Sequence, residues 1–196
     1  MVRWIAALGV AALVAATPLA AQTFPPLTGR VVDSANLLDP AQEAALDAKL
    51  TSVEQRTGRQ FVVATVPSLE GHTIEDYGYR LGRTWKIGNE QKDDGTLLIV
   101  APAEHKVRIE TGYGARVFLT DAVSSVIIRE AIVPRFKAND YPGGIAAGAD
   151  AIINMLQLSP QEAARRAKEV GAAEAQRAPE DQGDEPRPAR GRSPLR

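Results

Sequence analysis

TLLIVAPAEHKVRIE, residues 96–110, is the stretch of the sequence that decides the fold. Residues 96–100 form a short run of apolar and β-branched residues, which is typical of a buried strand. A short turn containing Pro102 follows, and residues 106–110 then alternate between polar and apolar side chains. This alternation is expected of a strand with one buried face. The stretch therefore predicts an antiparallel hairpin.

Upstream of the hairpin, the sequence predicts another buried strand and a helix. Residues 61–66 are apolar or β-branched and are closed by Pro67. A helix should begin near Thr73 and bury a stripe made of Ile74, Tyr77, Leu81 and Trp85. A strand, a helix and a second strand in this order imply a parallel pair with a right-handed crossover. Together with the hairpin, this passage predicts a mixed sheet.

Cap residues predict the helix that precedes these strands. Asp39 is a good N-cap, Pro40 suits the first helical position, and Gln42 is placed for a capping box. Gly58 should end this helix. Residues 30–33 are expected to add a short strand before it.

Two further helices are expected after the hairpin. Thr120 or Asp121 can cap a helix that Pro134 should end. Residues 139–144 are expected to form a turn, so the last helix of the domain should begin at Ile145. The order of the elements predicts an α/β fold, a three-layer α/β/α sandwich with a mixed central sheet, over residues 24–158.

The two ends of the chain have a different character. Arg3, the apolar run 5–16 and small residues before Gln22 are typical of a secretory signal over residues 1–21, cleaved after Ala21. An uncleaved anchor is the alternative, although the apolar run is shorter than the ~20 residues of a membrane span. We therefore expect an exported, periplasmic or otherwise extracytoplasmic protein without a transmembrane helix in its mature chain. Residues 159–196 form a charged tail, expected to stay helical to about 175 and then to be disordered.

The composition excludes several classes of function. The chain has 23 Lys and Arg residues against 24 Asp and Glu residues, so nothing in its charge points to a nucleic acid as partner. It has no cysteine and 2 histidines, which excludes thiol chemistry and disfavours zinc sites. No phosphate-binding loop ending in Gly-Lys-Ser/Thr and no Gly-x-Ser-x-Gly motif occurs.

Acidic residues lie at corresponding ends of the two hairpin strands. Asp93 and Asp94 come just before one strand, while Glu110 and the Gly-Tyr-Gly loop 112–114 end the other. The start of one strand and the end of its antiparallel neighbour lie at the same edge of a sheet, so both segments should converge there. Asp121 follows closely enough in sequence to approach them.

Carboxylates that share an edge repel one another unless a cation or a proton neutralises them. Ca²⁺ and Mg²⁺ prefer oxygen ligands of this kind. The sharper hypothesis is therefore a divalent cation site. The alternative is that Asp94 and Gly95 simply form a turn and that Glu110 is a solvated strand residue.

Six segments of the sequence, in this order, resemble motifs of the TPM domain family. They are residues 32–38 (VDSANLL), 85–88 (WKIG), 93–100 (DDGTLLIV), 107–114 (VRIETGYG), 119–122 (LTDA) and 140–144 (DYPGG). The resemblance implies a Rossmann-like α/β/α sandwich that faces an extracytoplasmic compartment. It also implies an acidic cleft that binds a divalent cation, and acid phosphatase activity in some members. Matched by motif, the acidic candidates here are Asp33, Asp93, Asp94, Glu110 and Asp121.

Two functions remain open at this point. The first is a non-catalytic accessory module that assists a membrane-protein complex, and the second is a metal-assisted acid phosphatase acting on phosphomonoesters. A bound cation can polarise a phosphoryl oxygen and lower the pKa of bound water. The sequence shows no evident nucleophile or histidine acid, and a Ca²⁺ site made of oxygen ligands is more often structural than catalytic. We therefore favour the accessory role. Many bacterial relatives continue into a membrane helix and a glycine-rich tail, whereas this sequence ends in a charged segment, which implies a soluble or loosely attached protein.

Overall fold

The computed structural model describes residues 24–177. The expected export signal at residues 1–21 and the last part of the expected tail lie outside these residues. The elements in chain order are β1 (Val31–Asp33), α1 (Pro40–Thr57), β2 (Phe61–Thr65), α2 (Ile74–Thr84), β3 (Thr96–Ala101), β4 (Lys106–Thr111), the 3₁₀ turn η1 (Tyr113–Ala115), α3 (Asp121–Ile127), the π-helical turn η2 (Ile128–Ile132), α4 (Val133–Lys137), α5 (Tyr141–Leu156) and α6 (Pro160–Arg177).

The sheet has the mixed topology that the sequence predicts. Its strand order is β1-β2-β3-β4. The first three strands are parallel, and β4 pairs antiparallel with β3 in a register that places Thr96 opposite Thr111. The amino ends of β1, β2 and β3 therefore lie at the same edge of the sheet as the carboxyl end of β4.

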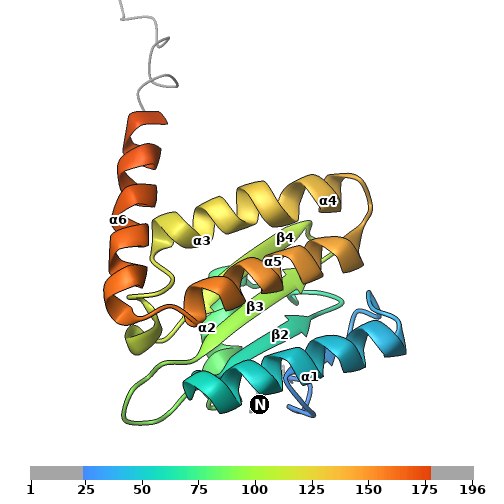
Figure 1. Cartoon of the computed structure of the whole chain (residues 1–196). Coiled ribbons are helices and arrows are strands. Elements are labelled where there is room, and N and C mark those ends of the chain that lie inside the picture. Colours follow the sequence, from blue (N-terminus) through green and yellow to red (C-terminus); the bar gives the residue numbers. More distant parts are fainter. Residues whose placement is uncertain (1–23, 178–196) are drawn as a thin grey trace, which may run out of the picture.

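Helices cover both faces of the sheet, which makes a three-layer sandwich (Figure 1). On one face, α1, α5 and the α3–α4 segment enclose a large apolar core that includes Leu50, Leu98 and Ile152. On the other face, α2 and the chain before β1 enclose a smaller core around Leu81 and Leu97. The expected fold class is confirmed.

Local sequence explains the ends of α1. The Asp39 carboxylate accepts a hydrogen bond from the Gln42 N–H, and the Gln42 side chain accepts one from the Asp39 N–H, so the expected capping box is present. The helix ends at Gly58 in the left-handed conformation, with φ of 71°. Asp47 then ties α1 to the sheet by accepting a hydrogen bond from the Val31 N–H at 3.1 Å.

The expectation that Pro134 ends a helix is wrong. The helical path continues through η2 into α4 and ends at Lys137. A proline in an α-helix lacks an N–H and clashes with the carbonyl four residues earlier. Here the chain widens into a π turn just before the proline, where the Val133 N–H donates to the Ile128 carbonyl five residues back. The wider turn accommodates Pro134 without ending the helix.

The expected turn at residues 139–144 is also partly wrong, because α5 already begins at Tyr141. Asp140 caps it by accepting a hydrogen bond from the Gly143 N–H at 2.9 Å, and Pro142 fits the first turn. The expected tail starts as α6, which ends at Arg177. No helix within residues 24–177 combines the length and the apolar character needed to cross a bilayer.

Candidate functional site

The two segments expected to converge at the sheet edge do so. The Gly114 N–H donates to the Asp93 carbonyl at 2.8 Å, and the Gly112 N–H donates to the Gly95 carbonyl at 2.9 Å. The Tyr113 N–H donates to the Asp93 carboxylate, with a nitrogen–oxygen distance of 2.9 Å. Hydrogen bonds thus hold the loop before β3 against the Gly-Tyr-Gly loop after β4.

The glycines of that loop are required by this close approach. A Cβ atom at Gly112 would lie 2.2 Å from the Asp93 carbonyl oxygen, and one at Gly114 would lie 2.1 Å from the Lys92 carbonyl oxygen. Both distances are far shorter than van der Waals contact. The loop glycines therefore serve backbone packing, whatever else the site does.

Asp93 and Asp94 have different roles, although they are neighbours. Asp94 is only 7% exposed, and its carboxylate accepts a hydrogen bond from the Asn89 N–H at 3.0 Å. It therefore stabilises the turn, as expected from the alternative in which Asp94 and Gly95 simply form a turn. Asp93 is exposed and has a φ of 48°, a conformation that a residue other than glycine seldom adopts. Lys86, with φ of 50°, is a second such residue in the same region.

Glu110 and Asp121 do not add their carboxylates to Asp93. The Glu110 side chain lies beside α2, where a Cβ atom at Gly78 would be 2.9 Å from its Cγ atom, and its carboxylate accepts a hydrogen bond from the Arg108 guanidinium. Asp121 is the exposed first residue of α3, and its neighbour Thr120 caps the helix. The two loops converge at this edge, but the carboxylates of Asp93, Glu110 and Asp121 lie in different parts of the protein.

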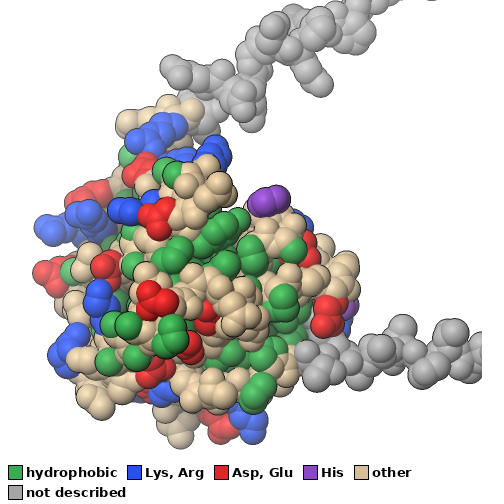
Figure 2. Space-filling view, turned by 90° about the vertical axis from the view of Figure 1, so that its right-hand side faces the viewer, with side chains coloured by type: hydrophobic (Ala, Val, Ile, Leu, Met, Phe, Trp, Pro, Cys, Tyr) green, Lys and Arg blue, Asp and Glu red, His purple; other side chains and the backbone are tan. Residues whose placement is uncertain are grey.

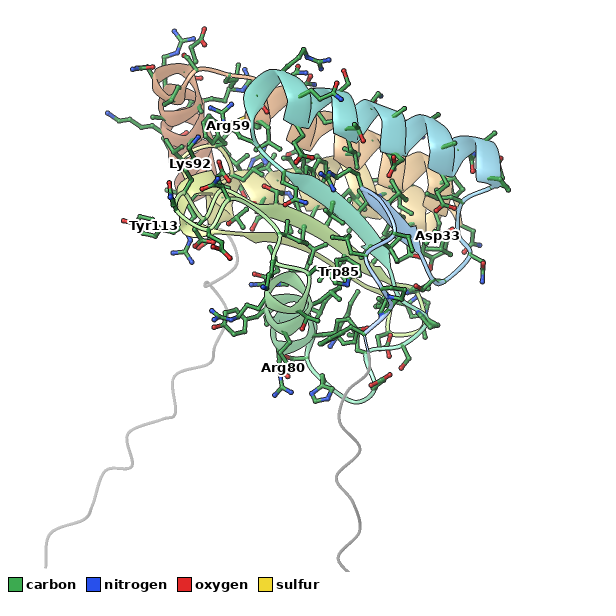
Figure 3. All side chains as sticks on the ribbon, turned by 90° about the horizontal axis from the view of Figure 1, so that it is seen from below. Asp33, Arg59, Arg80, Trp85, Lys92 and Tyr113 are labelled. Carbon is green, nitrogen blue, oxygen red and sulfur yellow. The ribbon has the colours of Figure 1, made fainter. Side chains whose placement is uncertain are left out.

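Asp33 lies at the opposite edge of the sheet, so it cannot share a site with Asp93. It ends β1 opposite Thr65, whereas Asp93 precedes the start of β3. Figure 3 shows Asp33 and Tyr113 at opposite ends of the molecule. The Asp33 carboxylate accepts hydrogen bonds from the N–H groups of Leu37 and Leu38 at 3.1 and 2.7 Å, which makes it a brace for the loop after β1.

Figure 2 looks onto the right-hand end of the molecule in Figure 1, which is the end that carries the start of α1. Hydrophobic side chains gather near the centre of this face, with acidic side chains scattered between them.

Within residues 24–177, no three Asp, Glu or His side chains are grouped so that they could hold a metal ion. A cation site made from all five acidic candidates is therefore incompatible with this arrangement.

A cleft of about 670 Å³ opens beside Asp93, between α2 and the two converging loops. We call it the edge cleft. It is lined by Gly78, Tyr79, Gly82, Arg83, Lys86, Ile87, Gly88, Asn89, Glu90, Asp93, Gly95, Thr96, Leu97, Glu110, Thr111, Gly112, Tyr113 and Arg116. Lys86 and Asp93 are two of the six non-glycine residues with positive φ among residues 24–177, and the other four lie elsewhere. The edge cleft is the candidate site because it adjoins the converging loops and gathers exposed charged and aromatic side chains.

Comparison with known proteins identifies the family of the chain. The TPM domain family matches residues 31–155, well over half of the sequence and nearly all of the sheet and its helices. The chain belongs to the TPM domain family. No curated protein is significantly similar to it.

Solved structures support the assignment to the TPM domain. The N-terminal domain of a Porphyromonas gingivalis protein, determined by solution NMR, is 35% identical over 66% of this chain and 82% of its own, with a TM-score of 0.62. An N-terminal domain from Corynebacterium glutamicum is 16% identical over 73% and 91% of the two chains, with a TM-score of 0.53. The BA42 protein of Bizionia argentinensis is 20% identical over 61% and 81%, with the same TM-score. The last two show the fold alone.

Sequence reasoning missed the basic and aromatic part of this TPM domain's cleft. Tyr79 and Arg83 lie on the exposed side of α2, and Lys86 follows the helix. Their spacing of four and three residues is a signal that places them on one helical face. The prediction of α2 rested only on its opposite, apolar face. Arg116, two residues after the Gly-Tyr-Gly loop, also lines the cleft.

Neither histidine of the TPM domain lines the cleft. His72 precedes α2 and pairs with Asp76, with a distance of 3.1 Å between Nδ1 and the carboxylate. His105 lies in the hairpin turn with a φ of 53°. The two histidines therefore contribute no side chain to the candidate site.

Proposed function

We propose that this protein is an extracytoplasmic accessory module, and that it binds a membrane-protein complex through the edge cleft without catalysing a reaction itself. The observation that carries the proposal is the make-up of the cleft. Exposed tyrosine and arginine side chains surround it, while none of its lining residues within 24–177 is a histidine, serine or cysteine. Tyr and Arg are the residue types that contribute most to protein interfaces. A hydrolase built on a serine, cysteine or histidine would need one of these residues there. The acid–base candidates that the lining does offer are the carboxylates of Glu90, Asp93 and Glu110.

The expected export signal supports the proposed extracytoplasmic location. Arg3, the apolar run 5–16 and the small residues before Gln22 match the plan of a secretory signal. We propose that the domain works on the outer side of the cytoplasmic membrane, where it can reach the exposed parts of membrane proteins.

We propose a divalent cation at one or two of the carboxylates of the cleft, and not at all five candidates. Asp33, Asp94 and Asp121 do not line the cleft, and Glu110 is paired with Arg108. Of the five candidates this leaves Asp93, and Glu90 is a further exposed carboxylate of the lining. A site with one or two carboxylates suits Mg²⁺, which keeps several waters, better than Ca²⁺, which takes 6–8 oxygen ligands. Calorimetric titration with each ion, repeated on Asp93→Asn, tests this assignment.

The test of the accessory role is photo-crosslinking in living cells. A photoreactive phenylalanine analogue at position 113, in the cleft, should crosslink to a discrete membrane protein. The same analogue in place of Gln161, exposed on α6, should not. Equal crosslinking from both positions, or none from position 113, would contradict the proposed role of the cleft.

Metal-assisted hydrolysis of phosphomonoesters is the second candidate, and one specific observation favours it. Arg83, Lys86 and Arg116 line the cleft and could bind a phosphoryl group. Hydrolysis of p-nitrophenyl phosphate, measured with Mg²⁺ and with Ca²⁺, decides between the two functions. Turnover that is lost in a folded Asp93→Asn variant would establish an enzyme, and turnover equal to the blank would favour the accessory module.

A further inference from the structure

Two tyrosines on the rim of the edge cleft are unusually exposed. Tyr79 of α2 is 59% exposed and Tyr113 of η1 is 79% exposed, and among residues 24–177 only these two and Val117, at 37%, are large hydrophobic residues classed as exposed. Tyr113 also begins its 3₁₀ turn with its backbone fixed by Asp93, so its ring is presented from a rigid loop. Rigid, exposed aromatic residues supply contact area at low cost in conformational entropy.

Among residues 24–177, the basic side chains of the cleft have no acidic partner. Arg83, Lys86 and Arg116 take part in none of the ion pairs formed between the described residues. Arg83 instead lies over the Tyr79 ring, 5.5 Å from its centroid, and donates to the Tyr79 hydroxyl at 3.3 Å. The planar guanidinium groups of Arg83 and Arg116 are suited to binding a carboxylate through two parallel hydrogen bonds.

The acidic side chains of the cleft offset only part of this positive charge. The Glu110 carboxylate is paired with Arg108. Asp93 and Glu90 keep their negative charges, since the Tyr113 N–H that donates to Asp93 is neutral. The three cations Arg83, Lys86 and Arg116 therefore face two carboxylates, and the balance left to a ligand is positive.

The floor of the cleft is open at one glycine. A Cβ atom at Gly82 would have a single neighbour within 4 Å, the Leu97 side chain at 4.0 Å. Gly78, Gly95 and Gly112 also line the cleft, but they pack against the protein itself, where a Cβ atom would lie within 2.2–2.7 Å of another atom. An extended peptide rises about 3.3 Å per residue and could follow such a floor between the two tyrosines.

We infer that the edge cleft binds an extended acidic segment of a protein partner, with Tyr79 and Tyr113 contacting its apolar side chains and Arg83, Lys86 and Arg116 its carboxylates. This inference rests on the proposed accessory function and names the chemistry of the partner. Complementary charge also accelerates encounter and makes binding depend on salt.

A displayed library of random peptides, each about ten residues long and so able to span the cleft when extended, is the probe. Peptides retained by the protein should be enriched in Asp and Glu together with an apolar residue. The double variant Arg83→Glu/Arg116→Glu should lose this enrichment and bind the selected peptides about tenfold or more weakly, since like charges then face each other. Lys168→Glu, a charge reversal on the exposed face of α6, is the matched control and should bind like the wild type. Circular dichroism checks that each variant is folded.

Enrichment in basic or purely apolar peptides would overturn the inference, and so would an acidic enrichment that survives in the double variant. Displacement of the selected peptides by millimolar inorganic phosphate would also overturn it, because the cleft would then recognise a small oxyanion. Failure of the proposed function is a separate result. Crosslinking from position 113 to a membrane protein, combined with no acidic enrichment, would keep the accessory role and reject only the acidic partner.

Discussion

Single residues in this domain carry roles that their chemistry alone does not reveal. Asp93, Asp94 and Asp33 are all aspartates in motifs of the same family, yet their roles differ. Asp93 is exposed in the cleft, and Asp94 is buried and accepts a hydrogen bond from the Asn89 N–H. Asp33 stabilises a loop at the opposite edge of the sheet. The sequence predicts which segments meet, because strand order and direction determine the sheet edge. It does not predict where each carboxylate points, because that depends on which backbone N–H groups the loops leave without a partner.

Replacing Asp33 with alanine should destabilise the fold without affecting the cleft. The substitution leaves the N–H groups of Leu37 and Leu38 and the Thr65 hydroxyl without their acceptor. We expect a loss of about 1–3 kcal/mol in the free energy of unfolding, measured by urea denaturation. Cation binding, if present in the wild type, should be unchanged. Loss of cation binding in a folded Asp33→Ala protein would contradict the separation of the two edges.

Glu104 should make stability depend on pH. The Leu69 N–H and the Ser68 hydroxyl donate to its carboxylate at 2.8 and 2.9 Å and hold its pKa below the ordinary value of 4.5. A carboxyl with a lowered pKa stabilises the fold above its unfolded-state value and loses that contribution as the pH falls through the folded-state value. Stability should therefore decline below about pH 4.5. Glu104→Gln should reduce this decline in urea titrations at pH 7 and pH 3, and Glu43→Gln on α1 should leave it unchanged.

At the scale of elements, the sequence predicts those helices and strands whose ends carry their own signals. The capping box of α1 and the Thr120 cap of α3 are local, so both starting points are correct. The predictions for the end of α3–α4 and for the start of α5 are wrong. Pro134 is tolerated because a π turn precedes it. At the start of α5, the Asp140 cap and Pro142 are local signals that the prediction overlooked, whereas Gly144 reflects tertiary packing, because Phe136 lies where its side chain would be.

Helix α6 should depend on one small buried residue. Ala163 is fully buried against the larger core, and α6 is joined to the π turn by ion pairs of Arg129 and Arg177 with Glu174 and Glu130. Ala163→Asp places a carboxylate in an apolar site, which is costly without a partner. We expect amide hydrogen exchange to increase throughout residues 160–177 while β2 and β3 stay protected. Ala164→Asp, on the exposed side, is the control. Equal protection in both variants would show that α6 does not dock through Ala163.

At the scale of the whole molecule, the two layers are unequal. The face under α1, α3 and α5 has three helical segments, whereas the other has α2 and the chain before β1. Phe24 packs edge-on against Tyr77 at 5.1 Å, and the Trp85 indole N–H donates to the Pro25 carbonyl at 2.8 Å. The start of the described chain is thus part of the smaller core.

Removal of residues 22–27 should therefore destabilise the whole domain. The truncation uncovers Tyr77 and Trp85 and removes the packing of Phe24 and Leu27. Full burial of each such side chain contributes about 1.5–3 kcal/mol, so we expect a loss of about 3 kcal/mol in the free energy of unfolding. Trp85→Phe, which loses the hydrogen bond to Pro25 but keeps most of the packing, should cost less. A truncated protein as stable as the full one would show that residues 22–27 do not stabilise the domain.

The β3–β4 hairpin also has a consequence for how fast the protein folds. Its strands are joined by a short turn, whereas β1 and β2 are joined through α1 and pair only after a long loop has closed. Closing a long loop costs more entropy than closing a short one, and this cost arises before the favourable contacts form. The hairpin should therefore form early, and β1 should pair late. In stopped-flow experiments, Leu98→Ala should mainly slow folding and Val31→Ala mainly speed unfolding. Because the loops around the edge cleft flank this hairpin, the cleft would take shape before the last strand joins the sheet.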